Sequence, residues 1–331
     1  DPARLPEYLE QILRLEAVAC KDWLTNKVDR CVGGLVAKQQ CAGPLQLPLN
    51  DCGVMALDFD AGKGVATAIG HAPASGLIDP AKGVRNAVAE ALANLVWAPL
   101  EDGIRSVSLS ANWMWPCRND GEDARLYHAV QAASDFCIAL GVNIPTGKDS
   151  LSMKQKYENE EVLSPGTVII SSAGVCADLN KVVEPVLQRD GGPICYVNLS
   201  MDDYHLGGSS FAQVRNRVGS TAPDIRDAER FAATFDAIQE LIKAGQIVAG
   251  HDVSAGGLLT TLLEMCFADN DLGAEIDLST LGEADTIKLL FAENCGLVFQ
   301  LKDEAAAEAV AALPIPGHLI GRVTAGNPLK V

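Results

Sequence analysis

Two short stretches carry residues whose types and spacing suit a metal–phosphate site. Asn50 and Asp51 lie in a loop with apolar flanks, and further along the chain Glu90 and Asn94 stand four positions apart. Residues i and i+4 of a helix share one face, so Glu90 and Asn94 can offer two oxygen atoms to one point and Asp51 a third. Such oxygen ligands suit Mg²⁺, often with nucleotide phosphates. On spacing alone, an ordinary solvated helix face is the commoner explanation.

Three further loops gather polar residues between apolar elements. The pair Gly147-Lys148 does not make a P-loop, because Gly141 lies one residue too far upstream and Asp149 stands where Ser or Thr is required. What remains is a flexible loop with Lys148, Asp149 and hydroxyls, which suits a metal–phosphate site or an ordinary surface turn. The three loops are Ser110–Met114, Pro145–Met153 and Gly250–Gly257.

The last of these loops contains His, Asp and Ser in close succession. Ser254 lacks the Gly-x-Ser-x-Gly context of a hydrolase nucleophile. Because neighbouring residues on a strand point to opposite faces, we expect His251 and Asp252 not to converge. We therefore expect Asp252 to be a metal ligand and Ser254 to contact a phosphate or ribose. Glycines before a helix, as at Gly256-Gly257, let backbone N–H groups approach an anion, although such a pair is more often a plain turn.

Composition limits the classes of protein to consider. The chain has 331 residues, 48% of them hydrophobic and 21% charged, which predicts two globular domains. A net charge of −17 without a basic stripe argues against a nucleic-acid binder. The sequence has no apolar window long enough to span a membrane and no signal-peptide pattern. Ten scattered cysteines without metal-ligand spacing predict buried, reduced thiols in a cytoplasmic protein.

Hydrophobic periodicity, together with cap and turn residues, predicts an α+β fold in two parts. Asp79 is a plausible N-cap for a helix that starts at Pro80, Gly141 ends another helix, and Gly191-Gly192 marks a domain boundary. The predicted helices are 1–20, 80–98, 122–140, 227–244, 258–268 and 304–312, and the predicted strands are 28–40, 54–59, 64–70, 104–110, 167–176, 194–199, 247–251 and 296–302.

Taken together, the loops resemble the synthetase region of the large-type phosphoribosylformylglycinamidine synthase family. The resemblance covers nearly the whole chain, which looks like the second of two related halves, each similar to aminoimidazole ribonucleotide (AIR) synthetase. The first half and the glutaminase domain are then missing, and the start at Asp1 without Met also suggests a fragment. The residues that carry the resemblance are Pro48–Val54, Arg85–Asn94, Ser110–Met114 with Gly121–Asp123, Ile144–Lys154, and His251–Gly257.

The resemblance implies a fold and a set of partners. It implies an AIR-synthetase-like half with an N-terminal α/β domain, which forms a shared β-barrel on dimerisation, and a C-terminal α/β domain. We place the helix or linker at 1–20 and the two domains at 21–188 and 189–331. We expect a homodimer, because large exposed apolar surfaces are normally covered, and a fragment that is inactive without the first half and the glutaminase.

The resemblance also implies the chemistry and the site residues. The family uses ATP to phosphorylate the amide oxygen of formylglycinamide ribonucleotide, and ammonia from glutamine then displaces phosphate to give the amidine. This half is expected to hold Mg²⁺ and ATP or ADP at an auxiliary site. The implied Mg²⁺ ligands are Asp51, Glu90, Asn94 and Asp252, and the nucleotide contacts are Asn50 and Ser254. Nearer the productive site, Asn112 is implied for ATP, and Asp149 with Ser150 or Ser152 for metal and substrate.

One departure and two alternatives bear on these expectations. Where first halves carry Glu-Ser-Gln, this chain reads Glu293-Asn294-Cys295, which puts a substrate-binding role of that turn in doubt. A stand-alone, catalytically inactive nucleotide-binding or regulatory homodimer of the same fold is the main alternative. A free-standing relative of selenophosphate synthetase or thiamine-monophosphate kinase is a weaker one, and the runs Ser110–Met114 and Gly147–Ser150 argue against it.

Overall fold

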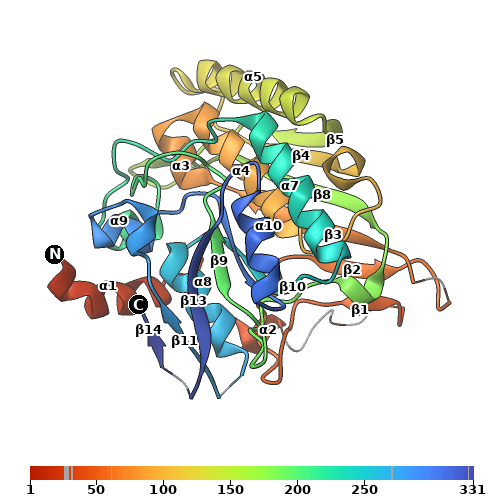
Figure 1. The fold of residues 1–331 in the computed structure, drawn as a ribbon. Coiled ribbons are helices and arrows are strands. Elements are labelled where there is room, and N and C mark those ends of the chain that lie inside the picture. The colour runs from red at the N-terminus through yellow and green to blue at the C-terminus, as the bar shows by residue number, and fades with distance from the viewer. Residues whose placement is uncertain (26–29, 31–32, 61, 270, 327) are drawn as a thin grey trace.

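The computed structural model describes residues 1–25, 30, 33–60, 62–269, 271–326 and 328–331, and it contains two six-stranded sheets. The strands of the first sheet lie between Val36 and Cys176, and those of the second between Ile194 and Lys330. Figure 1 shows the helices of the upper part packed beside the first sheet, with the second sheet below and in front of them. The predicted boundary at residues 188–189 falls between the two sets of strands.

The first sheet is mixed and presents one open face. Its order is β1-β2-β3-β8-β4-β5, and only β4 and β5 pair in parallel. Burial alternates along β8, where Val168 and Ile170 are buried while Ser171 is exposed, as expected when helices cover one face alone. The strands are β1 (Val36–Lys38), β2 (Gly53–Ala56), β3 (Gly64–His71), β4 (Ser108–Met114), β5 (Asn143–Ser150) and β8 (Thr167–Cys176), with a separate hairpin of β6 (Lys154–Lys156) and β7 (Glu161–Leu163).

Helix α4 (Pro80–Leu95) covers the closed face of this sheet. It begins at Asp79, whose carboxylate accepts hydrogen bonds from the N–H groups of Ala81 and Lys82, and Pro80 occupies its first turn. The helix approaches β3 so closely that a Cβ at Gly70 would lie 2.2 Å from the Ala87 carbonyl oxygen. Short α3 (Pro73–Ile78) precedes α4, and α5 (Glu122–Leu140) packs on its outer side.

The second sheet has the order β10-β12-β9-β13-β11-β14, so β10 is an edge strand. Helix α8 (Gly257–Phe267) packs against β10 and β11, and α9 (Thr286–Phe291) lies against α8. The remaining elements of this part are the strands β9 (Ile194–Val197), β10 (Ile247–Val253), β11 (Leu272–Ile276), β12 (Gly296–Leu301), β13 (His318–Ala325) and β14 (Leu329–Lys330), and the helices α6 (Ser210–Val214), α7 (Ala228–Lys243) and α10 (Ala307–Ala311).

One hydrophobic core joins the two parts of the chain. Alternate residues of β12 face opposite ways, so Phe299 packs into the core that includes α4, while Val298 packs into a second core with α8. Gln239 of α7 is fully buried and binds the other part through its amide: its oxygen accepts from the Leu100 N–H at 2.6 Å, and its nitrogen donates to the Ala98 carbonyl at 3.0 Å. Residues of both parts can therefore hold a site in fixed geometry.

Several predicted elements have the expected bounds. The helix 122–140 and the strand 167–176 match α5 and β8, and the helix starting at Pro80 and the strand 64–70 match α4 and β3 closely. In the second part, the strands 247–251 and 296–302 and the helices 227–244 and 258–268 correspond to β10, β12, α7 and α8. Several of these have a strong local signal, such as the Asp79 cap of α4, the Asp227 cap of α7 and the terminating Gly141 of α5.

Other predicted elements are wrong in extent or type. The helix 1–20 is limited to α1 (Leu5–Leu13), preceded by a 3₁₀ turn, Pro2–Arg4. Of the strand 28–40 only Val36–Lys38 forms β1, and residues 28, 29, 31 and 32 lie outside the described part of the chain. The strand 104–110 divides into a 3₁₀ turn, Gly103–Ser106, and β4. The loop 145–153 is mostly strand, because Asn143–Ser150 pairs with β4.

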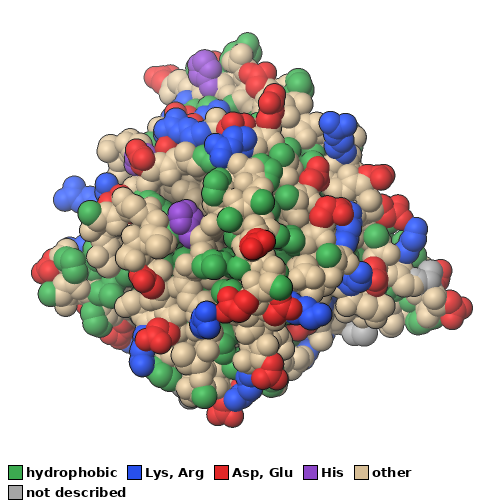
Figure 2. Space-filling view, in the orientation of Figure 1, with side chains coloured by type: hydrophobic (Ala, Val, Ile, Leu, Met, Phe, Trp, Pro, Cys, Tyr) green, Lys and Arg blue, Asp and Glu red, His purple; other side chains and the backbone are tan. Residues whose placement is uncertain are grey.

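The surface and the cysteines agree with the composition. Among the described cysteines none is in a disulfide, seven are buried, and burial raises the pKa of Cys137 and Cys266 to about 11. Figure 2 shows acidic and basic side chains interspersed on the face drawn there, without a continuous basic stripe. Within the described residues no helix has the length and apolar character needed to cross a membrane.

Candidate functional site

Asp51, His251 and Asp252 meet in a buried cluster between the two parts of the chain. The potential ligand atoms of the three side chains all lie within 4.8 Å of one another. Nδ1 of His251 is 2.6 Å from Oδ1 of Asp51 and 3.6 Å from Oδ1 of Asp252. On its other side, Nε2 of His251 is 3.0 Å from Oε2 of Glu264 in α8. The imidazole is thus held between carboxylates from three segments.

The edge position of β10 explains how these side chains converge. Because β10 has no strand beyond it, the N–H of Asp252 is free to donate to Oδ2 of Asp51 at 3.2 Å. Asp51 therefore lies beside the edge of β10. His251 and Asp252 are adjacent in this strand and point to opposite faces, but both can reach a group at its edge. The expectation that His251 and Asp252 would not converge is wrong, because it considered only the two faces of the strand and not its edge.

Burial and mutual repulsion set the charges of the cluster. Burial and the neighbouring Asp51 carboxylate raise the pKa of Asp252 well above its usual range, and His251 opposes this only in part. Burial lowers the pKa of His251, but Asp51 and Glu264 outweigh it and raise that pKa well above its ordinary value. Three acidic side chains, Asp51, Asp252 and Glu264, therefore surround one imidazole in a largely buried place, which favours an additional cation there.

Glu90 and Asn94 share one face of α4, as their spacing predicts. Oε2 of Glu90 accepts a hydrogen bond from the His71 N–H at 2.7 Å, and Nδ2 of Asn94 donates to the Ile69 carbonyl at 2.9 Å. Both side chains thus bind the end of β3. The Glu90 charge also helps to raise the pKa of Asp252, so it belongs to the same electrostatic neighbourhood as the cluster. Asn94 shows no such connection among the described contacts.

A cavity of about 170 Å³ adjoins this neighbourhood and is lined by Glu90, Ser254 and Glu293. Oε1 of Glu293 accepts hydrogen bonds from the N–H groups of Ser210 and Gly256, at 2.8 and 2.7 Å. Burial raises the pKa of Glu293 in spite of these two donors. Ser254 therefore lies close enough to Glu90 for both to border one ligand in this cavity. Glu293 lines the same cavity, and it belongs to the turn whose role the sequence left in doubt.

A second, open cavity of about 860 Å³ lies on the uncovered face of the first sheet. Asn50, Asp51 and Ser110 are among the residues that line it. The Asn50 amide donates to the carbonyl oxygens of Gln39 and Cys41, at 2.7 and 3.0 Å, so this side chain holds the loop that carries Asp51. Asp51 and Glu90 consequently border different cavities.

Of the other predicted site residues, Asn112 lies on β4, Asp149 and Ser150 lie at the end of β5, and Ser152 follows β5. Asn112 stands opposite Lys148 in the parallel ladder, and Asp149 and Ser150 stand opposite the next residues of β4. Nζ of Lys148 donates to Oγ of Ser150 at 2.6 Å. Neither cavity is lined by Asn112, Asp149, Ser150 or Ser152. The structure therefore does not bring this group together with the Asp51 cluster.

Sequence reasoning missed His251 and Glu264 as members of the site, and it left the role of Glu293 in doubt. His251 was set aside because of strand alternation, and Glu264 and Glu293 had no recognisable spacing from the other residues. The sequence holds one weak signal for Glu264: this acidic residue lies on the predicted helix that follows the strand of His251. The signal can be recognised only once the structure is known. The role of Glu293 depends on two helix starts that the turn happens to meet.

Sequence comparisons identify both parts of the chain. Residues 20–175 match the FGAR-AT PurM_N-like domain, and residues 196–331 match the C-terminal domain of AIR synthase related proteins. The phosphoribosylformylglycinamidine synthase of Homo sapiens is 45% identical over 304 residues, covering 91% of this chain and 22% of the relative. A probable chloroplastic/mitochondrial enzyme of that name from Arabidopsis thaliana is 42% identical, covering 99% and 23%. The chain thus spans about a quarter of the length of these relatives.

Solved structures share the fold. Thermotoga maritima PurL complexed with FGAR superposes with a TM-score of 0.64 at 17% identity, covering 83% of this chain and 44% of that one. The same protein complexed with ADP gives a TM-score of 0.62 at 17% identity, covering 96% and 47%. At such low identity the likeness concerns the fold, which is an AIR-synthase-like arrangement of two α/β domains with mixed sheets.

Proposed function

The chain belongs to the phosphoribosylformylglycinamidine synthase family, and from that premise we propose that it forms one nucleotide-binding half of such an enzyme. The reaction that we assign to the whole enzyme is the ATP-dependent conversion of formylglycinamide ribonucleotide and ammonia into the amidine in purine biosynthesis. We further propose that this is the second half, that it divides at residues 20 and 188, and that alone it is inactive. The plant relative has an organellar name, so a cytoplasmic location stays a prediction.

We place Mg²⁺ and the phosphates of ATP or ADP at the cluster of Asp51 and Asp252. The observation that carries this proposal is that two carboxylates 201 positions apart meet in a buried place with too little positive charge. Their oxygens fit Mg²⁺, and Glu90 is the third ligand in this proposal, with Asn94 completing the set after its amide turns from Ile69. When bound, Mg²⁺ neutralises charge on the phosphates.

The chain's own residues have distinct tasks in this arrangement. His251, fixed by Glu264, orients the carboxylate of Asp51 through the 2.6 Å contact. Ser254 presents its hydroxyl to the nucleotide from the cavity beside Glu90. Asn50 holds the loop of Asp51 through its amide nitrogen, and we keep it as a candidate nucleotide contact. Asn112, Asp149, Ser150 and Ser152 remain our candidates for a productive site that the other half of the enzyme completes.

The open face of the first sheet is the surface that we propose for that other half. Met55, Ile69 and Val175 expose 45%, 59% and 38% of their area there, on β2, β3 and β8. Exposed apolar surface of this kind usually meets a partner. When this chain is studied alone, a second copy is expected to take the place of the other half and form a homodimer.

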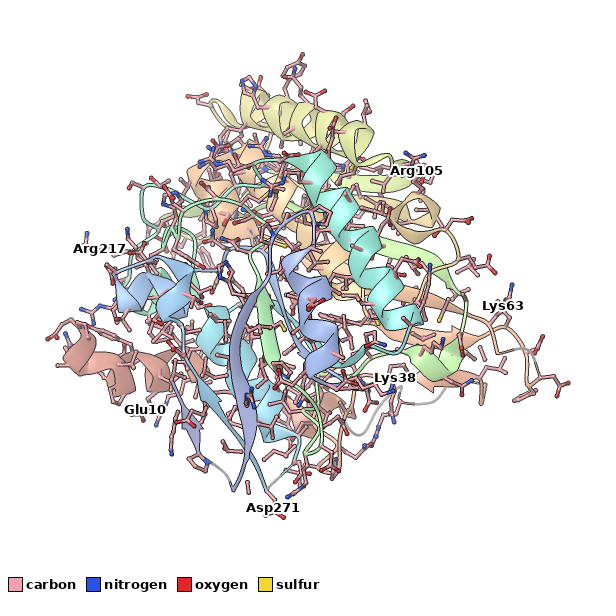
Figure 3. All side chains as sticks on the ribbon, viewed as in Figure 1. Glu10, Lys38, Lys63, Arg105, Arg217 and Asp271 are labelled. Atoms are coloured by element: carbon pink, nitrogen blue, oxygen red, sulfur yellow. The ribbon has the colours of Figure 1, made fainter. Side chains whose placement is uncertain are left out.

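Calorimetric titration with ADP in the presence of Mg²⁺ tests the nucleotide site. We expect saturable binding to the wild-type chain, at least about tenfold weaker binding to Asp51→Ala and Asp252→Asn, and none when Mg²⁺ is omitted. The Asn variant keeps the size of Asp252 and removes only its charge. Asp271→Ala is the control, since Asp271 is exposed at the far end of the second sheet in Figure 3. Failure of the wild-type chain to bind, or equal binding by Asp51→Ala, would contradict the proposal.

A further inference from the structure

A pocket of about 360 Å³ lies beside the glycine-rich turn at Gly207-Gly208 and is separate from the cavity of the proposed nucleotide site. The cavity that holds Glu90 includes Gly208 and Ser210, whereas this pocket includes Gly207 and Phe211, and the two share no lining residue. Its volume falls within the range of small-molecule sites. The residues that line it are Tyr204–Gly207, Phe211, Ala212, Arg215, Arg217, Gly219–Thr221 and Lys288.

The charge of this pocket is opposite to that of the chain. The whole sequence has 43 acidic and 26 basic residues, yet Arg215, Arg217 and Lys288 line the pocket together with His205 and no carboxylate does. Hydroxyl groups of Tyr204, Ser220 and Thr221 add neutral hydrogen-bonding groups. A concave surface with several cations and hydroxyls is the chemistry that recognises a phosphoryl group.

The cations are only weakly engaged within the chain. No described residue forms an ion pair with Arg217, and Nζ of Lys288 is 4.0 Å from the nearest Glu283 oxygen, with 43% of the lysine side chain exposed. The Arg215 guanidinium lies over the Tyr8 ring at 5.6 Å, and its charge contributes to lowering the pKa of Glu7, so it is the most engaged of the three. Figure 3 shows Arg217 extending from the left edge of the molecule.

The loop that carries two of the arginines is fixed by backbone contacts. The N–H groups of Gly207 and Gly208 donate to the carbonyls of Thr221 and Val218, at 3.1 and 2.7 Å, and the Arg217 N–H donates to Ala212 at 2.9 Å. A Cβ on Gly219 would lie 2.6 Å from the Cα of Gly207, so the two backbones are in direct contact. The pocket wall is thus formed before any ligand arrives, which lowers the entropy cost of binding.

We propose that this pocket binds a small phosphorylated anion, with Arg217 and Lys288 as its principal contacts and Arg215 as a third. The guanidinium of Arg217 suits two phosphoryl oxygens at once, and the Lys288 ammonium supplies a point charge on the facing helix α9. The assignment stands apart from the nucleotide site, because it needs neither Mg²⁺ nor any residue of the Asp51 cluster.

Titration with inorganic pyrophosphate, in buffer with EDTA and no divalent cation, tests this assignment. We expect saturable one-to-one binding by the wild-type chain and about tenfold weaker binding by Arg217→Ala and by Lys288→Ala. Arg105→Ala is the matched control, because Arg105 is an exposed arginine on the opposite side of the molecule in Figure 3. Thermal unfolding followed by circular dichroism shows that each variant retains its fold.

Three outcomes would overturn the assignment. They are no saturable binding of pyrophosphate to the wild-type chain, unchanged affinity in both pocket variants, and equal loss of affinity in the Arg105→Ala control, which would indicate unspecific charge attraction. A parallel titration with hexaglutamate separates a protein partner from a small molecule. Binding of hexaglutamate that depends on Arg217 and exceeds that of pyrophosphate would also reject the small-anion assignment. Loss of Mg²⁺–ADP binding in Asp51→Ala leaves the pyrophosphate result untouched, so the two proposals fail independently.

Discussion

Replacing Arg85 with alanine is expected to destabilise the chain by about 2–3 kcal/mol, because it leaves Asp224 buried without its cation. The guanidinium binds both carboxylate oxygens, Nε to Oδ1 at 2.7 Å and NH2 to Oδ2 at 2.8 Å. Arg85 belongs to α4 and Asp224 to the segment before α7, so this bidentate pair fastens the two parts of the chain together. Neighbouring Asn86 adds a bond from its amide to the Pro223 carbonyl at 2.9 Å.

The magnitude follows from the exposure of the two side chains. Breaking a fully buried ion pair costs about 3–5 kcal/mol. The Asp224 side chain is 10% exposed, but that of Arg85 is 24% exposed, so water partly solvates the site and the expected cost lies at or just below the lower end of that range. Asp224 also keeps the N–H of Ile225 at 2.8 Å after the arginine is removed. For the pair itself we expect a coupling free energy of about 2 kcal/mol.

Urea unfolding of a double-mutant cycle measures this coupling. The variants are Arg85→Ala, Asp224→Ala and the double substitution, compared through their midpoints and slopes at one pH. Arg322 and Glu304 supply the control cycle, since they form an equally short pair of 2.7 Å with side chains that are 72% and 61% exposed. Exposed pairs are screened by water, so no measurable coupling is expected there. A coupling below about 0.5 kcal/mol between Arg85 and Asp224 would refute the reasoning.

Two further predictions concern the open sheet face and the end of β3. Light scattering should show a dimer for the wild-type chain and a monomer for Ile69→Lys, which places a charge on the open sheet face. The control Ile138→Lys, on α5 at a site 74% exposed, should leave the dimer intact. A monomeric wild-type chain would reject the interface. Hydrogen bonding to Glu90 raises the pKa of His71 although burial opposes it. The resulting stabilisation is present below the unfolded pKa of about 6.5 and is lost as pH rises through the folded value. An NMR titration should find this pKa raised in the wild type and returned toward normal in Glu90→Gln.

Local signals in the sequence were sufficient for the elements that carry most of the site. Asp79 and Pro80 define the start of α4, and the helical spacing then places Glu90 and Asn94 on the face that meets β3. The run of β-branched residues from Thr167 predicts β8 for a similar reason. Each of these features depends on residues that lie within a few positions of one another, so it can be predicted from the sequence alone.

Pairing partners could not be read in the same way. Residues 145–150 look like a loop because Pro, Gly, Lys and Asp are poor strand formers, yet the ladder with β4 makes them a strand. The energy that decides this comes from hydrogen bonds to a segment more than thirty residues away in the chain. Conversely, residues 104–106 have apolar and basic character that suits a strand, but the Ile104 N–H donates to Asp236 at 2.8 Å and a 3₁₀ turn results.

The candidate site shows the same division between local and distant causes. The family resemblance implied one site for Asp51, Glu90 and Asp252, but the sequence could not show that β10 would be an edge strand. That position allows Asp51 to lie beside the strand and draws His251 into the cluster. An edge is a property of the whole sheet, fixed by which strands are absent on one side. His251 therefore enters the site through topology.

The packing between the two parts explains why such a site can be built from both. Gly250 follows Ala249 in β10 and faces the indole of Trp97, where a Cβ would lie 2.1 Å from a ring carbon. Trp97 lies two residues after the end of α4, which carries Glu90, and Gly250 directly precedes His251. The close contact thus joins the segment with one predicted ligand to the segment with the others. Because any larger side chain at residue 250 would force these segments apart, the geometry of the cluster depends on this glycine even though it provides no ligand itself.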